Sequence, residues 1–234
     1  MFPLNDTEPN RYGGSLPVMT LAIIFVNALV LYIDDRVWET TNVAFYVLLF
    51  RRAFGSIPQM ILGQTGGGAL SSLTAMFLHG DILHLSGNMY ALWVFGRRVE
   101  DACGAWRFLG FYLASGLCAD IISTLFRYNS PIPSIGASGA LFGVMGAYLL
   151  LFPGGKIRTL ILLGPVPLLP KLQAFWIVFY FLFLQLIAAY RLLIYQMESR
   201  VDYWAHLGGF FSCFLVFFFL RREAFARYLS KTPV

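Results

Sequence analysis

Long apolar runs, separated by short polar or glycine-rich segments, recur along most of the chain. A membrane-spanning helix needs about 20 apolar residues, and shorter helices are tolerated where neighbouring helices cover their ends. The runs are too long and too unbroken for the alternating strands of a membrane barrel, so they predict helices. We expect one membrane domain over residues 17–220, with six spans at 17–33, 81–97, 107–126, 138–152, 173–193 and 203–220.

An unusually long segment, residues 34–80, separates the first two predicted spans. It is not a simple polar loop, because apolar stretches such as NVAFYVLLF are interrupted there by Arg51, Arg52, Pro58 and several glycines. This mixture is typical of a segment that lies partly in the membrane interface, as a re-entrant or amphipathic structure. The predicted fold class is therefore an all-α membrane protein, a six-helix bundle with a long first loop.

The composition excludes an ordinary water-soluble domain. Hydrophobic residues make up 58% of the chain and the mean hydropathy is +0.68, while charged residues make up only 12%. A soluble domain carries about twice that share of charged residues. Cys103, Cys118 and Cys213 lie in or beside different apolar runs without CxxC or metal-site spacing, so we interpret them as small core residues.

The positions of Lys and Arg predict the orientation, because positive charges are enriched on the cytoplasmic side of membrane proteins. With a cytoplasmic N-terminus, 11 of the 17 Lys and Arg residues fall on the inside. We therefore expect both the short N-terminal segment, 1–16, and the basic tail, 221–234, to be cytoplasmic. This placement accounts for the net charge of +5, so no nucleic-acid partner is needed to explain it.

A few polar side chains lie within the predicted spans, where they are costly unless they face the bundle interior, and each is a functional candidate. They are His84 and Asn88 in the second span, Ser138 at the start of the fourth and His206 in the sixth, with His79 just before the second. If the fourth span ends at the cytoplasmic face, the helix rise places Ser138 roughly 8 Å below the outer surface. The same rise places Asn88 about 10 Å and His206 about 5 Å below the outer ends of their spans. These polar groups are expected in one layer.

Ser138 lies between Gly136 and Gly139 in the segment PSIGASGALFGVMG, where a loop is predicted to enter the fourth helix. One interpretation is close helix packing through small residues. The other is a nucleophile, because the free backbone N–H groups at a helix start can form an oxyanion hole. The segment alone does not decide between them.

His206 lies in the segment YWAHLGGF, with Gly209 on the same helix face. It could be a buried structural histidine. The small residues around it also allow close helix approach, so its imidazole could reach Ser138 and accept the hydroxyl proton.

His79, His84 and Asn88 form a third group, in HGDILHLSGNMYALWVFG. Metal binding is disfavoured, because HExxH is absent and His79 and His84 do not share a helix face. His84 and Asn88 do share one, which suits two donors to a developing oxyanion. Ordinary hydrogen bonding between helices is the alternative.

Together, the three segments resemble the rhomboid family of intramembrane serine proteases, over roughly residues 70–215. The family's GxSG motif matches Gly136, Ser138 and Gly139, its AHxxG motif matches His206 and Gly209, and its HxxxxHxxxN motif matches His79, His84 and Asn88. The resemblance implies that Ser138 is the nucleophile, His206 the general base, and His84 and Asn88 oxyanion donors. It also implies that Phe142 packs on the catalytic imidazole, and it implies no cofactor.

The sequence departs from the family pattern at two places. Leu70 and Ser71 stand where the family often has a Trp-Arg pair in the first loop, and Cys213 stands where a second glycine is common. The first departure puts the anchoring of that loop in doubt, and the second predicts slightly looser packing in the sixth span. Neither touches the residues of the chemistry.

The resemblance implies an intramembrane serine endopeptidase that cleaves transmembrane segments of other membrane proteins near the outer leaflet, through an acyl-enzyme. The aromatic fifth span, 173–193, is a candidate gate for the substrate. We expect a multi-pass protein of the plasma (inner) membrane of a prokaryote, with protein substrates and lipid as its partners and no metal. The alternative is an inactive rhomboid-like chaperone or trafficking factor. A transporter or channel is disfavoured, because no inverted repeat is visible and charges within the spans are nearly absent.

Overall fold

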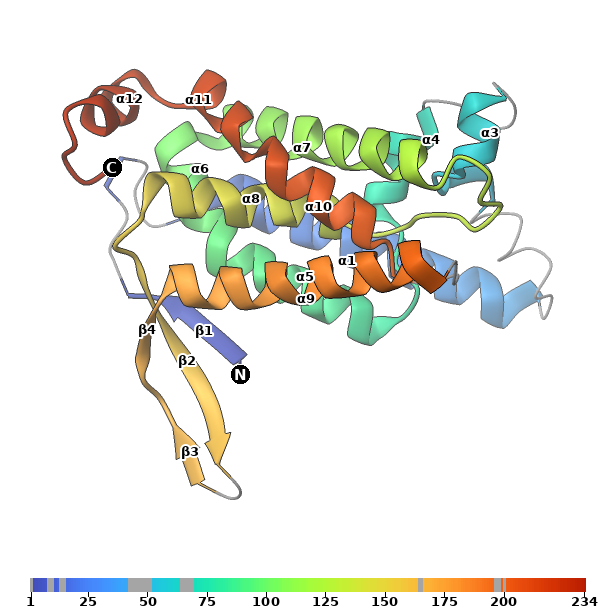
Figure 1. The fold of residues 1–234 in the computed structure, drawn as a ribbon, viewed down its shortest axis with the longest axis horizontal. Coiled ribbons are helices and arrows are strands. Elements are labelled where there is room, and N and C mark those ends of the chain that lie inside the picture. The colour runs from blue at the N-terminus through green and yellow to red at the C-terminus, as the bar shows by residue number, and fades with distance from the viewer. Residues whose placement is uncertain are drawn as a thin grey trace.

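A computed structural model describes residues 2–7, 11–12, 16–41, 52–63, 70–163, 166–195, 199 and 201–234. The fold is a bundle of apolar helices, with a small sheet at one end (Figure 1). The apolar runs form helices as the sequence predicts, and the all-α membrane fold class is confirmed. The prediction for residues 34–80 lies partly outside the described residues.

Three helices of the described chain are long and apolar enough to cross a membrane. They are α1 (Val18–Thr41), whose apolar part is Val18–Arg36, α7 (Ala105–Phe126) and α9 (Ala174–Tyr195). A fourth candidate joins Tyr203–Phe219 to Arg222–Leu229 across a bend of 109°. Three or four spans are therefore supported by length and composition in the described part of the chain, and the count of six stays a prediction.

The remaining predicted spans are short or divided. The second comprises α5 (Ile82–Ala91), the π-helical segment η2 (Leu92–Gly96) and α6 (Arg97–Cys103). The sixth comprises α10 (Tyr203–Phe211), η3 (Ser212–Leu215) and α11 (Val216–Phe219), and the fourth is α8 (Ser138–Leu151). The described residues also include the short helical elements α3 (Pro58–Leu62), α4 (Leu70–Thr74), η1 (Ala75–Phe77) and α12 (Arg222–Leu229).

The centre of the bundle is α8, which packs against α7, α9, α10 and η3. Of its 14 residues, 11 are buried. A helix that is apolar on all sides can be enclosed in this way, whereas an amphipathic one must keep a polar face in water. Ser138, the first residue of α8, therefore begins a helix that is packed on several sides by other helices.

A four-stranded antiparallel sheet lies at one end of the bundle (Figure 1). Its strands are β1 (Phe2–Asp6), β2 (Lys156–Leu163), β3 (Val166–Leu168) and β4 (Lys171–Gln173). Strand β2 pairs with each of the other three, with Phe2 opposite Leu160 and Ile161 opposite Leu168. The sequence pattern predicts no strand, so the sheet is a feature that the prediction misses.

The same end of the molecule holds both chain termini, α6 and α12 (Figure 1). Polar contacts tie these parts together: Arg98 forms a 3.0 Å ion pair with Asp6 of β1. Glu100 of α6 accepts hydrogen bonds from the backbone N–H groups of Met19 and Thr20, at 2.9 and 2.7 Å. It therefore satisfies the N-terminus of α1, whose first N–H groups lack partners within the helix.

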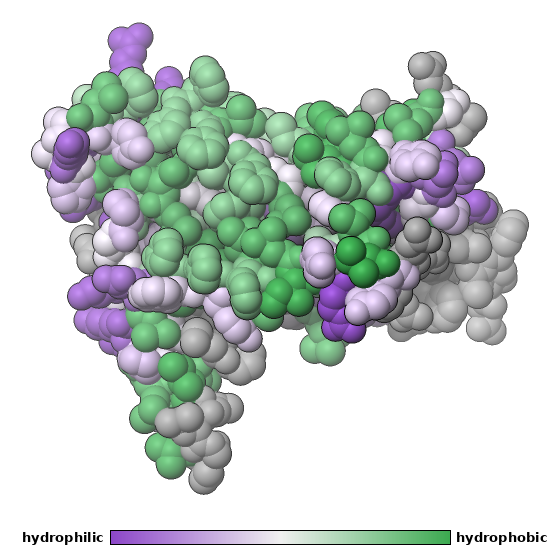
Figure 2. Space-filling view, viewed as in Figure 1, coloured by the Kyte–Doolittle hydropathy of each residue, from purple (hydrophilic) through white to green (hydrophobic). Residues whose placement is uncertain are grey.

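Figure 2 shows apolar side chains over the middle of the bundle, while hydrophilic side chains gather mostly toward its two ends. Large apolar side chains of α9 are exposed, among them Phe175, Trp176, Phe179 and Phe183. An exposed apolar belt between polar ends is stable in lipid and costly in water. The chain is an integral membrane protein.

Candidate active site

Ser138 is the first residue of α8, at the end of a loop that turns sharply at Gly136. Gly136 has a φ of +120°, a backbone conformation that side chains with a Cβ rarely adopt. Its N–H donates a 2.8 Å hydrogen bond to the carbonyl of Ala75, which ties the loop to η1. The nearby N–H groups in the first turn of α8 have no acceptor within the helix.

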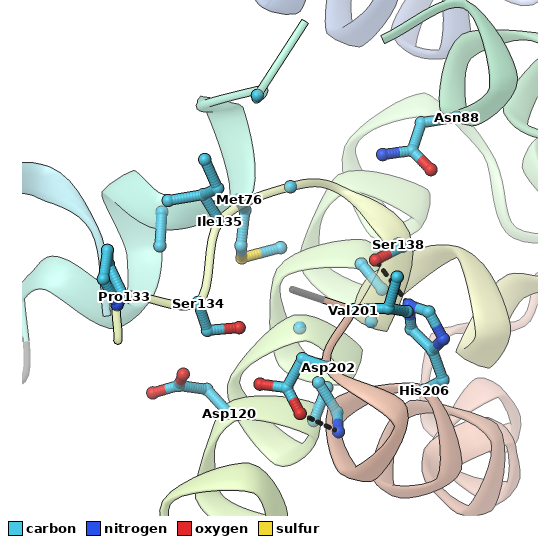
Figure 3. A pocket seen from close by; sticks show the side chains of 18 of the residues that line it. Met76, Asn88, Asp120, Pro133, Ser134, Ile135, Ser138, Val201, Asp202 and His206 are labelled. Atoms are coloured by element: carbon cyan, nitrogen blue, oxygen red, sulfur yellow. Dashed lines mark hydrogen bonds between the residues drawn. The ribbon is translucent and has the colours of Figure 1, made fainter. Parts of the chain in front are cut away.

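His206 lies in α10, and its Nε2 atom is 2.8 Å from the Oγ atom of Ser138 (Figure 3). His206 is buried, with 8% of the residue's surface exposed. The helix begins after Asp202, whose carboxylate accepts a 3.0 Å hydrogen bond from the N–H of Ala205. The structure therefore brings together the two residues to which the sequence assigns nucleophile and base.

The close approach of α8 and α10 depends on Gly209. A Cβ added to Gly209 would collide with the backbone carbonyl of Gly139. The backbones of the two helices touch at this point, directly after Ser138 in α8 and three residues after His206 in α10. The glycines singled out in the sequence are therefore where the two backbones meet. Farther along, Gly146 faces Cys213 closely, so Cys213 does not open the pair.

Two side chains hold the imidazole of His206 from other directions. The ring of Phe142 stacks on it, with centroids 4.6 Å apart and an angle of 16° between the planes. The Oε1 atom of Gln185, in α9, lies 2.8 Å from Nδ1 of His206. The contact with Phe142 agrees with the sequence expectation, whereas Gln185 was not among the candidates.

His84 and Asn88 of α5 lie against the loop at Gly136, two residues before Ser138. A Cβ on Gly136 would lie 2.9 Å from Nε2 of His84 and 3.5 Å from Nδ2 of Asn88, so both side chains border this loop. The amide of Asn88 donates to Nε2 of His79 over 2.9 Å, and the rings of His79 and His84 make an edge contact at 5.0 Å. His79 thus orients Asn88, which keeps a second N–H for another acceptor.

A cavity of about 820 Å³ opens beside these residues. Ser138, His206, His84 and Asn88 are all in its lining, and Figure 3 shows the dyad at its wall. The lining also includes the charged residues Asp120, Arg127 and Asp202. Among the described residues, no group of three His, Cys, Asp or Glu side chains is placed to hold a metal ion.

Asp202 and Arg127 form a 2.6 Å ion pair at the edge of this cavity. Burial would raise the pKa of Asp202, but the Arg127 guanidinium, the Ser123 hydroxyl and the Ala205 N–H together hold that pKa below its ordinary value. The carboxylate therefore stays ionised, and it anchors both the start of α10 and the chain after α7. The sequence interpretation missed this pair.

Asp120 and Gln185 were missed although a simple signal marks both. Each is a polar residue inside a predicted span, which is the criterion that selected His84, Asn88 and His206. In the structure Asp120 accepts a hydrogen bond from the Ser56 hydroxyl, and Gln185 contacts His206. Applied to every span, the same criterion finds them.

Comparisons with known proteins show the family of the chain. The Rhomboid domain family matches residues 67–223. The chain is 37% identical to "Rhomboid protease GluP" of Bacillus subtilis over 143 residues, 61% of this chain and 26% of that protein. It is 36% identical over 144 residues to "Rhomboid protein 1, mitochondrial" of Saccharomyces cerevisiae, 60% of this chain and 38% of that protein. It is also 33% identical to "RHOMBOID-like protein 7" of Arabidopsis thaliana, over 92% of this chain and 69% of the relative.

The chain thus spans well under half of the bacterial and yeast relatives, and more than two thirds of the plant one. The matched family region contains all the residues of the site described above, apart from Ser56. On this match, the chain belongs to the rhomboid family.

Proposed function

We propose that this protein is an intramembrane serine endopeptidase, which cleaves transmembrane segments of other membrane proteins. The observation that carries the proposal is the 2.8 Å contact between Nε2 of His206 and Oγ of Ser138, at the wall of a cavity of about 820 Å³. A serine becomes a nucleophile when a positioned base takes its proton, and a neutral imidazole suits that role near pH 7.

In the first step, the Ser138 oxygen attacks the carbonyl carbon of a substrate peptide bond, while its proton moves to Nε2 of His206. The carbonyl oxygen becomes an oxyanion. The Ser138 N–H, the remaining N–H of Asn88 and the imidazole of His84 are the proposed donors to it. They border the same loop, at Gly136.

In the second step, the imidazolium of His206 gives its proton to the leaving amine nitrogen and the C–N bond breaks. The carbonyl carbon then remains as an ester on Ser138 Oγ. A water molecule, deprotonated by His206, attacks this ester and releases the acid product with a free Ser138 hydroxyl. The polar cavity wall of Asp120, Arg127 and Asp202 favours hydration, which the second attack requires.

The placement of the site supports cleavage near the outer leaflet. The sheet, both termini and the basic tail lie at one end of the bundle, and Ser138 begins α8 at the end of that helix away from them (Figure 1). The positive charges of the tail bear on which side this is. If the end with the tail is cytoplasmic, as the positive charges indicate, the dyad faces the other side. The proposed location is the plasma membrane of a prokaryote, and the matched relatives include a Bacillus subtilis protein as well as a yeast mitochondrial and a plant protein.

The competing function is that of an inactive rhomboid-like chaperone or trafficking factor, which would share this fold. Such a protein has no need of a serine and an imidazole in hydrogen-bonding contact. The contact seen here therefore favours the protease.

The test is cleavage of a reporter transmembrane protein in proteoliposomes. The wild type should release a fragment, and Ser138→Ala and His206→Ala should not. Ser86→Ala is the matched control, because Ser86 is an exposed serine in α5 outside the cavity lining, and it should cleave at the wild-type rate. Cleavage that persists in Ser138→Ala would contradict the proposal.

A further inference from the structure

Gln185 lies in the middle of α9, in the run FYFLFLQLIAAY, where its neighbours are apolar. Its side chain is half-buried, whereas Leu184 and Leu186 beside it are exposed at 41% and 46%. A polar amide in an apolar helix is costly unless it is hydrogen-bonded inside the bundle. The position of Gln185 therefore calls for partners, and the structure supplies two.

The two ends of the Gln185 amide have different partners. Its Nε2 atom donates a 3.2 Å hydrogen bond to the backbone carbonyl of Phe181, one turn earlier in α9. Its Oε1 atom lies 2.8 Å from Nδ1 of His206. A backbone carbonyl can only accept, so the nitrogen of the amide must face Phe181 and the oxygen must face His206.

This orientation determines the protonation of the imidazole. An amide oxygen can only accept a hydrogen bond, so Nδ1 of His206 must carry the proton. A neutral imidazole carries one proton, and Nε2 is then left with a free lone pair directed at the Ser138 hydroxyl, 2.8 Å away. We propose that Gln185 is a positioning residue, which holds His206 in the tautomer that can accept the Ser138 proton.

The opposite tautomer could not do this. With the proton on Nε2, the imidazole would donate to the Ser138 oxygen and could not receive its proton. In serine protease triads, a buried carboxylate holds the histidine in the required tautomer. Replacing that carboxylate by an amide gives the wrong tautomer and lowers the rate strongly. A neutral amide can supply the same acceptor without placing a charge inside the bundle, where an unpaired charge is costly.

Among the residues that the structure describes, the other groups around His206 do not replace this contact. Phe142 and Tyr203 contact the ring by its face and edge, so they restrain its plane but not its proton. The ionisable groups that act on His206 are Asp202, at the start of α10, and His84, in α5. Asp202 instead binds Arg127, Ser123 and the N–H of Ala205.

The contact also makes the dyad depend on α9. This helix packs on α8 and α10, and much of its remaining surface is exposed. A displacement of α9 by about 1 Å would lengthen the bond beyond hydrogen-bonding range. The catalytic tautomer is therefore favoured only while α9 packs closely enough on α10 for Gln185 to accept the hydrogen bond from His206.

This inference rests on the proposed protease function, so its test combines kinetics with a measurement that does not need cleavage. Gln185→Met keeps the length of the side chain but removes the acceptor, and Gln185→Glu restores an oxygen. For cleavage of the reporter in proteoliposomes, we expect Gln185→Met to lower kcat by about 10- to 100-fold with KM nearly unchanged, because tautomer and orientation act on the chemical step. Gln185→Glu should recover most of the rate, and Leu186→Ala, an exposed position on the same helix, should match the wild type.

The second measurement is the ¹⁵N NMR spectrum of the full-length protein with labelled histidine, in the Ser138→Ala background. The His206 signals are assigned by their loss in His206→Asn. We expect a protonated Nδ1 and an unprotonated Nε2 with Gln185, and a mixture of tautomers with Gln185→Met. An unchanged tautomer in Gln185→Met would overturn the inference. Failure of the protease proposal would instead show as cleavage that persists in Ser138→Ala, whatever the spectrum.

Discussion

The ring of Phe142 lies flat on the imidazole of His206, with centroids 4.6 Å apart and planes 16° apart. Phe142 is four residues after Ser138 on the same face of α8, so one helix supplies both the nucleophile and the surface on which the base rests. An aromatic pair of this geometry is stabilised by roughly 1 kcal/mol beyond the burial of its area. The stacking therefore restrains the rotamer of His206.

Replacing Phe142 by Leu should leave the fold in place and lower the cleavage rate by about 5-fold, because the loss of about 1 kcal/mol of stacking lets the imidazole adopt other rotamers. Steady-state cleavage of the reporter measures this. The matched control is Phe126→Leu, since Phe126 stacks on Trp204 of the same helix, α10, with centroids 4.0 Å apart. A wild-type rate in Phe142→Leu would contradict the role given to the stacking.

Asn88→Ala should lower kcat by about 10²-fold if the amide donates to the oxyanion, since loss of one such donor costs about 10² to 10³. His79→Ala should have a smaller effect in the same direction, because His79 orients Asn88 through the 2.9 Å contact but does not reach the substrate. In the double variant the second change should add little, as expected for two residues of one network. Independent, additive losses would show that His79 acts elsewhere.

Gly209→Ala should destabilise the bundle by about 3 kcal/mol and abolish cleavage, because the new methyl group collides with the Gly139 carbonyl and separates His206 from Ser138. Thermal unfolding in detergent measures the first effect. Gly87→Ala is the control, because a Cβ on Gly87, in α5, meets nothing within 4 Å. Equal stability of the two variants would contradict the close packing of α8 and α10.

The ion pair of Asp202 and Arg127 predicts a pH dependence of stability. The pKa of Asp202 is lower in the folded protein than in the unfolded chain, where it is about 4. Its contribution is therefore fully present above pH about 4 and is lost as the pH falls through the folded-state value. Asp202→Asn should cost about 1–2 kcal/mol at pH 6, and the difference from wild type should shrink near pH 3. A difference that is independent of pH would contradict this.

Much of the bundle could be predicted because its helices correspond to continuous apolar runs. In lipid, such a run can satisfy its backbone hydrogen bonds in few ways other than a helix. Ser138 and His206 could be singled out as candidates because they are polar residues beside glycines in such runs, and their roles were implied by the resemblance to the rhomboid motifs. Their contact required α8 and α10 to meet at Gly209, which a local pattern can favour but cannot place in space.

The parts that escaped prediction depend on contacts between distant segments. The pattern of strand β2 is equally compatible with a loop or a buried segment. Its partner β1 lies at the N-terminus, far from β2 in the sequence. The sequence likewise does not determine which way the Gln185 side chain points. A single amide among aromatic residues does not show which face of α9 packs on the bundle. The Asp202–Arg127 pair joins two loop ends, which no periodicity marks.

The central claim, that Ser138 is a nucleophile activated by His206, is tested most directly by a fluorophosphonate probe, which reacts covalently with an activated serine and needs no known substrate. The membrane-embedded wild type and Ser86→Ala should be labelled alike. Ser138→Ala should not be labelled, and His206→Ala should be labelled far more slowly. Equal labelling of Ser138→Ala and wild type, or no labelling of the folded wild type, would contradict the account.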